Sequence, residues 1–530
     1  MKRIFTVFLL VGLAFEASAQ TWQDALTFAE NDYLGTARSV GMGNAMTAVG
    51  GDLGSLTFNP AGAAVASYSQ FTITPGISIS SVFGQGTYMD GSPYGFEDGV
   101  KTPSGRVQIP NFGAMMVYDT RKKSGLKRVT FGLVGNMTRD YNNRLRATGT
   151  NGKTTLAGSF ATLADGYPEE VLQRDYFDDD IPYWNTLVGY KGGLIDPITG
   201  HDGSYLGLTQ VLLDNGKKCL SDPVGQYYGR TRRGNKYDLL MNFAMDFSDR
   251  FYVGANVGIT TLTYSDDTVI SEEALSGLRY RDDFQSLRFR DAIQEEASGV
   301  YAKIGFIARP SNGLRIGAAI QTPTLFEFRE TYGKAARSVA STNFNTDVEE
   351  TWYYNFKTPF RFNAGIAYTI GKVAMLSADY ELCDYSMMSF RPAYDDYYTN
   401  FDVVNQDILE MAGASHMLRL GGELKPSPEM AIRVGYNYTT SPEIGVEVGR
   451  QSVSFGLGYS SAGSFFADFA VRFQYLPDEL IVPYDYYYYS SSYSPSSVKR
   501  EPLIDESVQT PEICSQASLC NAIMTLGWRF

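Results

Sequence analysis

The chain has few of the residues that bind transition metals. Its 530 residues include only two histidines, His201 and His416, and four cysteines, which form no C-x-x-C pair. Structural zinc sites need clustered thiolates and imidazoles, so we expect no metal site and no cofactor. Cys514 and Cys520 are close enough in sequence to close a small disulfide loop in an oxidising compartment, and free thiols fit the sequence equally well.

The sequence also lacks the features of an enzyme or a nucleic-acid-binding protein. It contains no G-x-S-x-G motif, and neither histidine lies in a recognisable catalytic motif, so we expect no catalytic residues and no enzymatic activity. The net charge is -13 and no basic stripe occurs. Because phosphate binding requires concentrated Lys and Arg, a nucleic-acid partner is not expected.

Long apolar runs are absent after the first 19 residues. No stretch of 18 apolar residues follows, which excludes membrane-spanning helices. The start of the chain has the pattern of a secretory signal, in which the basic pair Lys2-Arg3 precedes apolar Ile4–Phe15 and the small-residue site Ala17-Ser18-Ala19. We predict a signal peptide over residues 1–19, cleaved after Ala19.

Tyrosine, phenylalanine and glycine are abundant, with 37, 32 and 53 residues. Aromatic girdles and glycine in strongly curved strands are typical of outer-membrane barrels. Segments 464–476 and 519–530 alternate apolar and polar residues, as a wall between lipid and lumen requires. The last segment ends on the aromatic residue Phe530, a feature that the outer-membrane barrel assembly machinery recognises. We expect an all-β protein, a transmembrane antiparallel β-barrel in the outer membrane of a Gram-negative cell.

Alternation elsewhere in the chain indicates about 14 strands, an even number typical of bacterial barrels. Tight links such as Ser248-Asp249 alternate with long connections at about 143–233, 266–295, 391–413 and 477–518. Short periplasmic turns and long extracellular loops give this alternation in membrane barrels. We therefore expect a barrel over residues 68–530 with both termini on the periplasmic side. The predicted strands are at 68–83, 106–119, 127–142, 234–247, 250–265, 296–310, 313–332, 350–369, 372–390, 414–425, 429–441, 450–461, 464–476 and 519–530.

Residues 20–67 do not have the pattern of barrel strands. Ala25, Leu26 and Phe28 suggest a short helix, and the stretch that follows is rich in small residues, so this segment could fill the lumen. From Arg38 to Gly62 the chain reads R-S-V-G-M-G-N-A-M-T-A-V-G-G-D-L-G-S-L-T-F-N-P-A-G. Asn can cap and turn the chain, Pro lacks a ladder donor, and small residues allow close packing in a narrow lumen.

This stretch resembles the N-terminal hatch of the FadL-like outer-membrane transport family, which carries an Asn-Pro-Ala motif just before the first barrel strand. Asn59, Pro60 and Ala61 match that motif in type and place. The resemblance extends over nearly the whole mature chain, through Ile109–Gly113, Thr322-Pro323, Thr358-Pro359, Ala378–Glu381, Arg433–Tyr438 and Ser441-Pro442.

The resemblance implies a plugged 14-stranded barrel that carries long-chain fatty acids or related hydrophobic molecules across the outer membrane by passive diffusion. A hatch around Phe58, Asn59, Pro60 and Ala61 would gate it. In the family, an inward kink of the third strand opens the wall sideways, and the corresponding stretch here contains Gly132, Gly135 and Asn136. For a ligand carboxylate, the arginines near the outer end of that strand could donate charge-assisted hydrogen bonds; they are Arg139, Arg144 and Arg146.

The expected partners are a fatty-acid-like ligand and the lipid bilayer, with the chain a monomer. An alternative role for the same scaffold is a surface receptor or a component of a secretion or attachment assembly, because a fold alone does not choose a function. A transporter needs a contiguous apolar pocket beside the hatch, whereas a scaffold can fill its lumen with paired charges. The sequence leaves this choice and the identity of the ligand open.

Overall fold

The computed structural model describes residues 20–86, 88–89, 92–93, 95–174, 184–201, 203–214, 216–371, 373–393, 400–461, 463–485, 487–489, 500–502 and 510–530. The predicted signal peptide and its cleavage site after Ala19 lie outside these residues. No helix in the described ranges is both long and apolar enough to cross a membrane.

The described strands form a closed antiparallel β-barrel, which confirms the predicted fold class. Its wall has 14 strands, of which five are built from two segments. The C-terminal strand closes the barrel by pairing with both the first strand and the thirteenth. The wall strands are, in order, β1 (Gln70–Gly86), β4 (Val100–Asp119), β5 (Leu126–Asp140) with β6 (Asn143–Asn151), β11 (Val224–Phe247), β12 (Phe251–Ala274), β13 (Ser286–Ala308), β14 (Leu314–Gln321) with β15 (Leu325–Val339), β16 (Phe344–Lys357) with β17 (Arg361–Ile370), β18 (Ala374–Asp384) with β19 (Ser389–Pro392), β20 (Ala414–Leu424), β21 (Met430–Thr439), β22 (Arg450–Ser460), β23 (Phe465–Tyr475) with β24 (Glu479–Ile481), and β27 (Ile513–Arg529).

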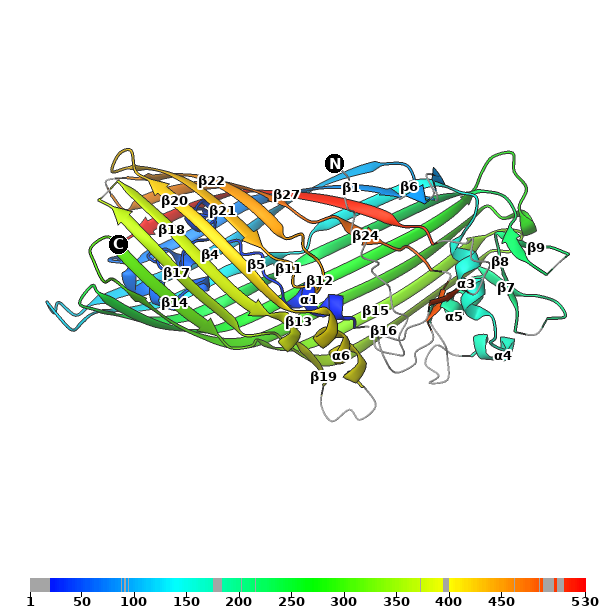
Figure 1. The fold of residues 1–530 in the computed structure, drawn as a ribbon, viewed down its shortest axis with the longest axis horizontal. Helices are drawn as coiled ribbons and strands as arrows, with labels where there is room; N and C mark the ends of the chain where they lie inside the picture. Colours follow the sequence, from blue (N-terminus) through cyan, green and yellow to red (C-terminus); the bar gives the residue numbers. More distant parts are fainter. Residues whose placement is uncertain are drawn as a thin grey trace.

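Short helical segments lie inside the barrel and in its long connections. Figure 1 shows the barrel with α1 within it and with α3 to α5 at the end where the long connections gather, which we call the loop end. The opposite end, with the tight links and the C-terminus, is the turn end. The remaining elements are α1 (Trp22–Ala29), α2 (Ala37–Gly41), η1 (Leu53–Thr57), η2 (Pro60–Val65), β2 (Tyr88–Met89), β3 (Ser92–Pro93), α3 (Leu156–Ala164), α4 (Glu169–Leu172), α5 (Trp184–Lys191), β7 (Ile195–Pro197), β8 (Tyr205–Gly207), β9 (Gln210–Leu212), β10 (Lys218–Leu220), η3 (Arg281–Asp283), η4 (Tyr385–Met387), α6 (Asp402–Met411), β25 (Tyr487–Tyr489) and β26 (Arg500–Pro502).

Several strands continue further toward the loop end than the sequence pattern predicts. β11 begins at Val224, and β12 and β13 leave only residues 275–285 between them, so the predicted loops at 143–233 and 266–295 are too long. Polar residues pair across these extensions, as Asp267 does with Arg290 at 2.8 Å. Their outer faces are not apolar, so they lack the alternation from which the strands were predicted.

The outward apolar side chains of the three longest strands gather nearer the turn end. Beyond this belt, Arg233, Thr263 and Gln294 are exposed. A tilted strand needs roughly 10 residues to cross the hydrocarbon of a bilayer, so these strands of 23 or 24 residues reach well outside it. The belt indicates an outer-membrane location. Its members on these strands are Leu239, Met241, Phe243, Phe251, Val257, Val300, Ile304 and Phe306.

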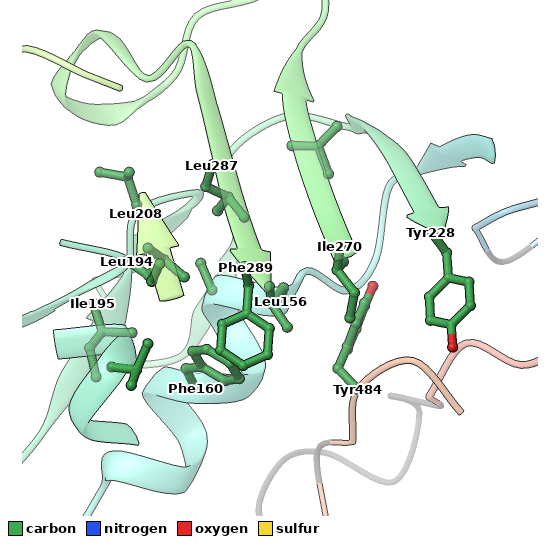
Figure 2. Close-up of a cluster of buried hydrophobic side chains, with 14 of the residues drawn as sticks. Leu156, Phe160, Leu194, Ile195, Leu208, Tyr228, Ile270, Leu287, Phe289 and Tyr484 are labelled. Atoms are coloured by element: carbon green, nitrogen blue, oxygen red, sulfur yellow. The ribbon is translucent and has the colours of Figure 1, made fainter. Parts of the chain in front are cut away.

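The long connection after β6 folds into a cap at the loop end. Phe160 of α3 packs against Phe289 of β13 with ring centroids 5.1 Å apart, and Tyr484 from the last long connection joins the same cluster (Figure 2). The loop end therefore has its own hydrophobic core, separate from the lumen.

The four cysteines, all described, are free. Cys514 and Cys520 lie on the same strand, β27, opposite Gln85 and Ile79 of β1. An extended strand rises about 3.3 Å per residue, so six residues hold the two thiols too far apart for a disulfide.

Candidate functional site

Residues 20–67, which we call the N-terminal segment, lie inside the barrel. Thr21 begins α1 with a capping box: its hydroxyl oxygen accepts from the Asp24 amide at 3.2 Å, and the Asp24 carboxylate accepts from the Thr21 amide at 2.9 Å. The buried face of the helix carries Trp22, Leu26 and Phe28. This short helix is thus held in the lumen by the packing of its apolar face.

That face packs into an aromatic cluster on the inner wall. The Phe28 ring lies 4.9 Å from the Phe328 ring and 5.8 Å from the Tyr264 ring, and Phe328 in turn stacks on Tyr354 at 5.0 Å. These contacts form one packed apolar core between α1 and the inner wall. The buried members of the aromatic cluster are Trp22, Phe28, Tyr141, Tyr264, Phe326, Phe328, Tyr354, Phe356, Tyr385, Phe390 and Phe401.

Cations from the wall hold the C-terminal end of α1. The Lys236 ammonium donates to the carbonyl oxygens of Phe28 and Glu30, at 2.7 Å each, and Arg361 donates to that of Ala29 at 2.5 Å. The last carbonyls of a helix have no partner within it and carry partial negative charge. The barrel therefore supplies the missing C-terminal cap.

The two acidic residues after α1 are also paired with wall arginines. Glu30 lies 3.1 Å from Arg139 and 2.8 Å from Arg450, and Asp32 lies 2.8 Å from Arg472. Burial alone would raise the pKa of Glu30, but Arg450 and Arg139 outweigh burial and hold that pKa below its usual range. Both acids are thus ionised anchors for the N-terminal segment.

The Asn-Pro-Ala motif lies at the base of the N-terminal segment, near the turn end. The Asn59 side-chain oxygen accepts from the Ala61 amide at 3.0 Å, and its nitrogen donates to the carbonyl oxygens of Thr47 at 2.8 Å and Phe306 at 2.9 Å. The Pro60 carbonyl accepts from Asn242 of β11 at 3.0 Å. The motif therefore ties η2 to two wall strands.

Glycine in the wall makes this close approach possible. A Cβ at Gly254 of β12 would lie 2.6 Å from backbone atoms of Pro60 and Ala61, and a Cβ at Gly317 of β14 would lie 2.5 Å from the Thr47 carbonyl oxygen. Neither clash could be relieved without a shift of the N-terminal segment. Phe58, beside the motif, is held between the Tyr33 ring at 4.9 Å and the Arg419 guanidinium at 4.6 Å.

Replacement of Asn59 by Ala should destabilise the folded barrel. The change leaves the carbonyls of Thr47 and Phe306 and the amide of Ala61 without this partner, and each unsatisfied buried group costs about 1–3 kcal/mol. We expect a lower guanidinium midpoint for unfolding, followed by tryptophan fluorescence, than for wild type. Exposed Asn312→Ala at a turn is the control, and equal midpoints for the two variants would contradict the anchoring role.

The wall is interrupted between β4 and β5. Their ladder runs from the turn end to the pair Asn111 and Asn136, and beyond this pair β4 continues toward the loop end along β1. The register between β5 and β11 skips Thr138, so this residue is a bulge. Beyond its last pair with β4, β5 therefore leaves β4 and stays paired with β11 alone.

The freed part of β5 bonds to the N-terminal segment instead. The amide of Leu34 donates to the Met137 carbonyl at 2.9 Å, and that of Asp32 donates to the Thr138 carbonyl at 2.7 Å. Tyr237 of β11 reaches past β5, and its hydroxyl donates to the Ile109 carbonyl of β4 at 3.0 Å. β5 is thus displaced into the lumen at this level.

The residues predicted to permit a kink lie at and just before the interruption. Gly132 and Gly135 are within the regular ladders to β4 and β11, and a Cβ at Gly135 would collide with the outward Phe112 ring. Asn136 is the last residue of β5 that pairs with β4; its side chain accepts from Asn111 at 2.7 Å and donates to Thr57 at 2.8 Å. Their part in a lateral opening stays a prediction.

A cavity of about 600 Å³ lies at the level of the interruption. Its lining includes buried lumen residues such as Tyr264 and Glu295, and exposed outward residues such as Arg233 and Glu296. The cavity therefore borders both faces of the wall, at the loop-end edge of the apolar belt. It is lined by Ser78, Ser80, Ser104, Gly105, Arg106, Asn142, Asn143, Arg144, Thr231, Arg232, Arg233, Gly234, Thr263, Tyr264, Ser265, Gln294, Glu295 and Glu296.

The three arginines proposed for a ligand carboxylate lie in different places. Arg139 is inside the lumen against Glu30, with its guanidinium 5.9 Å from the Tyr141 ring centroid. Arg144 lines the cavity, and Arg146 is exposed. Of the three, Arg139 alone contacts both Glu30 of the N-terminal segment and Tyr141 of the aromatic cluster.

Sequence reasoning missed the ion pair of Arg139 with Glu30, which Arg450 shares. The three residues are far apart in the chain, and the sequence contains no local signal that joins them. The bulge at Thr138 was equally hidden, because one unpaired residue leaves no mark in a pattern of alternation.

Structural comparison supports the architecture. No family model matches the chain, and no curated protein matches its sequence. A crystal structure of a Pseudomonas aeruginosa FadL homologue matches with a TM-score of 0.53 and 11% identity, over 94% of this chain and 99% of that one.

Two toluene transporters also align over almost their whole length. TodX of Pseudomonas putida has a TM-score of 0.48 and 12% identity, over 95% of this chain and 99% of its own. TbuX of Ralstonia pickettii has a TM-score of 0.45 and 13% identity, over 95% and 99%. On the match to the FadL homologue, this chain has the FadL fold, a 14-stranded barrel with an N-terminal segment outside the wall strands, which confirms the resemblance predicted from its sequence at the level of the fold.

Proposed function

We propose that the protein is an outer-membrane channel through which hydrophobic small molecules diffuse passively, with long-chain fatty acids as the best-suited ligands. The observation that carries the proposal is the interruption between β4 and β5, which borders a cavity of about 600 Å³ at the edge of the apolar belt. Tyr264 belongs both to this cavity and to the aromatic cluster. The aromatic cluster thereby adjoins, at Tyr264, a cavity that is otherwise lined mainly by polar residues and that reaches the gap in the wall.

A sideways exit suits an apolar ligand. Transfer of an acyl chain from protein into a water-filled channel costs about 0.8 kcal/mol for each CH₂. Passage through the wall into the bilayer lowers that cost, because the chain crosses only the mainly polar cavity at the interruption before it reaches lipid.

Helix α1 occupies the place that a fatty acid would take. Its Phe28 ring fills the aromatic cluster, and its neighbour Glu30 presents a carboxylate to Arg139 and Arg450. A fatty acid offers the same two features, an apolar tail and a carboxylate. In this proposal the ligand displaces α1 by substituting for both contacts.

The base of the N-terminal segment has a different role in the proposal. The hydrogen bonds of Asn59 to Thr47 and Phe306 and the close packing of Pro60 on Gly254 favour a fixed anchor. Gating then belongs to residues 20–34, while Phe58, Asn59, Pro60 and Ala61 hold the segment in the barrel.

The aromatic cluster also bears on the alternative role as a receptor or assembly component. Paired charges fill one part of the lumen, where Glu423 lies 3.1 Å from Arg38 and 2.7 Å from Arg433. The aromatic cluster holds α1, and it would offer a contiguous apolar surface to a ligand once α1 leaves; a channel uses such a surface, so the cluster favours the channel.

Replacement of Glu30 by Gln tests the role of α1. Removal of one charge from a buried ion pair costs several kcal/mol, and each 1.4 kcal/mol shifts an equilibrium about tenfold. We expect uptake of a neutral apolar probe by cells to rise about tenfold or more, because α1 leaves the lumen more often. The matched control is Glu410→Gln on the exposed face of α6, which should leave uptake unchanged. Equal uptake by both variants and wild type would remove α1 from the mechanism.

A further inference from the structure

Two glutamates face each other inside the barrel with no cation beside them. Glu295 of β13 and Glu330 of β15 are directly opposite in the ladder, and their side chains are 2% and 1% exposed. Like charges opposite each other in a sheet are destabilising, and burial increases the cost. In the described part of the chain, the charged groups that act most strongly on the two glutamates are each other and Asp24, and no Lys or Arg is among them.

The pair is only partly satisfied by hydrogen bonds. The Tyr354 hydroxyl donates to Glu295 at 2.9 Å, and the Gln20 side-chain amide donates to Glu330. The two carboxyl groups lie within hydrogen-bonding distance of each other. With both ionised, Glu295 Oε2 and Glu330 Oε1 are buried and accept no hydrogen bond from the described atoms. A group that donates hydrogen bonds and carries positive charge would complete this arrangement.

Signal-peptide removal would create such a group at the right residue. Cleavage after Ala19 makes Gln20 the first residue of the mature chain, with a free α-ammonium. By ordinary bond lengths the α-nitrogen of a Gln lies at most about 6 Å from its own side-chain nitrogen, and the Gln20 side chain already contacts Glu330 and is buried. The new charge would therefore arise within about 6 Å of the side-chain nitrogen that contacts Glu330, the residue paired with Glu295.

We propose that the α-ammonium of mature Gln20 binds the Glu295 and Glu330 carboxylates and latches α1 in the lumen. The inference extends the proposed function, since it names the contact that holds the N-terminal end of the gate, but it depends only on the position of the mature N-terminus. Processing would thus complete the plug: an uncleaved chain has an amide nitrogen at this position and no charge for the pair.

The test is the reactivity of the N-terminal amine in the full mature barrel. Folded protein is treated with an acetylating N-hydroxysuccinimide ester at neutral pH, and modification of the Gln20 peptide is followed by mass spectrometry against the same protein unfolded. We expect the Gln20 amine of folded wild type to react at least about tenfold more slowly than that of unfolded protein. The double variant Glu295→Gln and Glu330→Gln should react several-fold faster than folded wild type, although the remaining contacts of α1 keep it slower than unfolded protein. Glu327→Gln, on the opposite face of β15, should react like wild type.

Three results would overturn the proposal. One is a mature chain that begins at a residue other than Gln20 or carries a cyclised Gln20, because either lacks this amine. Another is equal protection of the Gln20 amine in wild type and the double variant. The last is wild-type reactivity equal to that of unfolded protein, which would mean that the glutamates share a proton instead. If the double variant fails to show heat-modifiable folding, Glu330→Gln alone supplies the comparison. The readout is independent of transport, so a failed latch and a failed channel are distinguishable.

Discussion

Deletion of Thr138 should nearly abolish uptake of oleate while the barrel still folds. Thr138 is the residue that the register between β5 and β11 skips. Without it, β5 can stay in the wall and pair with β4 beyond Asn136, which would close the interruption. Uptake of labelled oleate by cells that produce the variant should fall to background, and the folded band of the unheated protein should remain.

Thr138→Ala is the matched control, because it keeps the bulge and loses a single hydrogen bond, from the hydroxyl to the Lys236 carbonyl at 3.3 Å. Its uptake should be close to wild type. A second variant, Ser104→Trp, leaves every register unchanged and fills the cavity from β4, so it should also lower uptake. Normal uptake by both the deletion and the Trp variant would show that ligand leaves by another route.

Replacement of Arg139 by Gln should separate acids from neutral ligands. In the proposed mechanism Arg139 exchanges Glu30 for the carboxylate of the ligand, and a hydrogen bond to a charged group contributes about 1.5–3 kcal/mol. Uptake of oleate should therefore fall roughly tenfold to a hundredfold. Uptake of oleyl alcohol should be unchanged or higher, because the variant also loosens α1.

Arg146→Gln is the control for that experiment, since Arg146 is exposed. It should leave uptake of both ligands unchanged. The reverse result, loss of oleate uptake in Arg146→Gln alone, would place carboxylate recognition outside the lumen. An equal loss of acid and alcohol in Arg139→Gln would make Arg139 a structural residue only.

The barrel could be predicted from sequence because each wall strand faces lipid on one side. In β23, apolar Phe469, Val471 and Phe473 alternate with Ala470, Arg472 and Gln474, and this period of two appears in the sequence itself. The Asn-Pro-Ala motif was visible for a similar reason, since its backbone demands are local: Asn59 caps η2 and Pro60 is its first residue. Local rules therefore gave the strand order and the place of the N-terminal segment.

The candidate site depends on contacts that no local rule contains. Glu30 meets Arg139 and Arg450, and Asp32 meets Arg472, only after the barrel has closed. The loop-end extensions of β11 and β12 were missed because neither face contacts lipid there. The pairing of Glu295 with Glu330 was also hidden, because the two residues are adjacent only through the β13 and β15 register.

The route of the ligand is tested most directly by photo-cross-linking in reconstituted membranes. The ligand is a long-chain fatty acid with a diazirine at the end of its tail, and the modified residues are identified by mass spectrometry, with the Thr138 deletion giving the background from lipid-dissolved ligand. We expect modification above this background at residues 102–110 of β4, residues 137–146 of β5 and β6, and Tyr237. Modification along the inner faces of β17 to β22 down to the turn end, with none beside β5, would contradict a sideways exit.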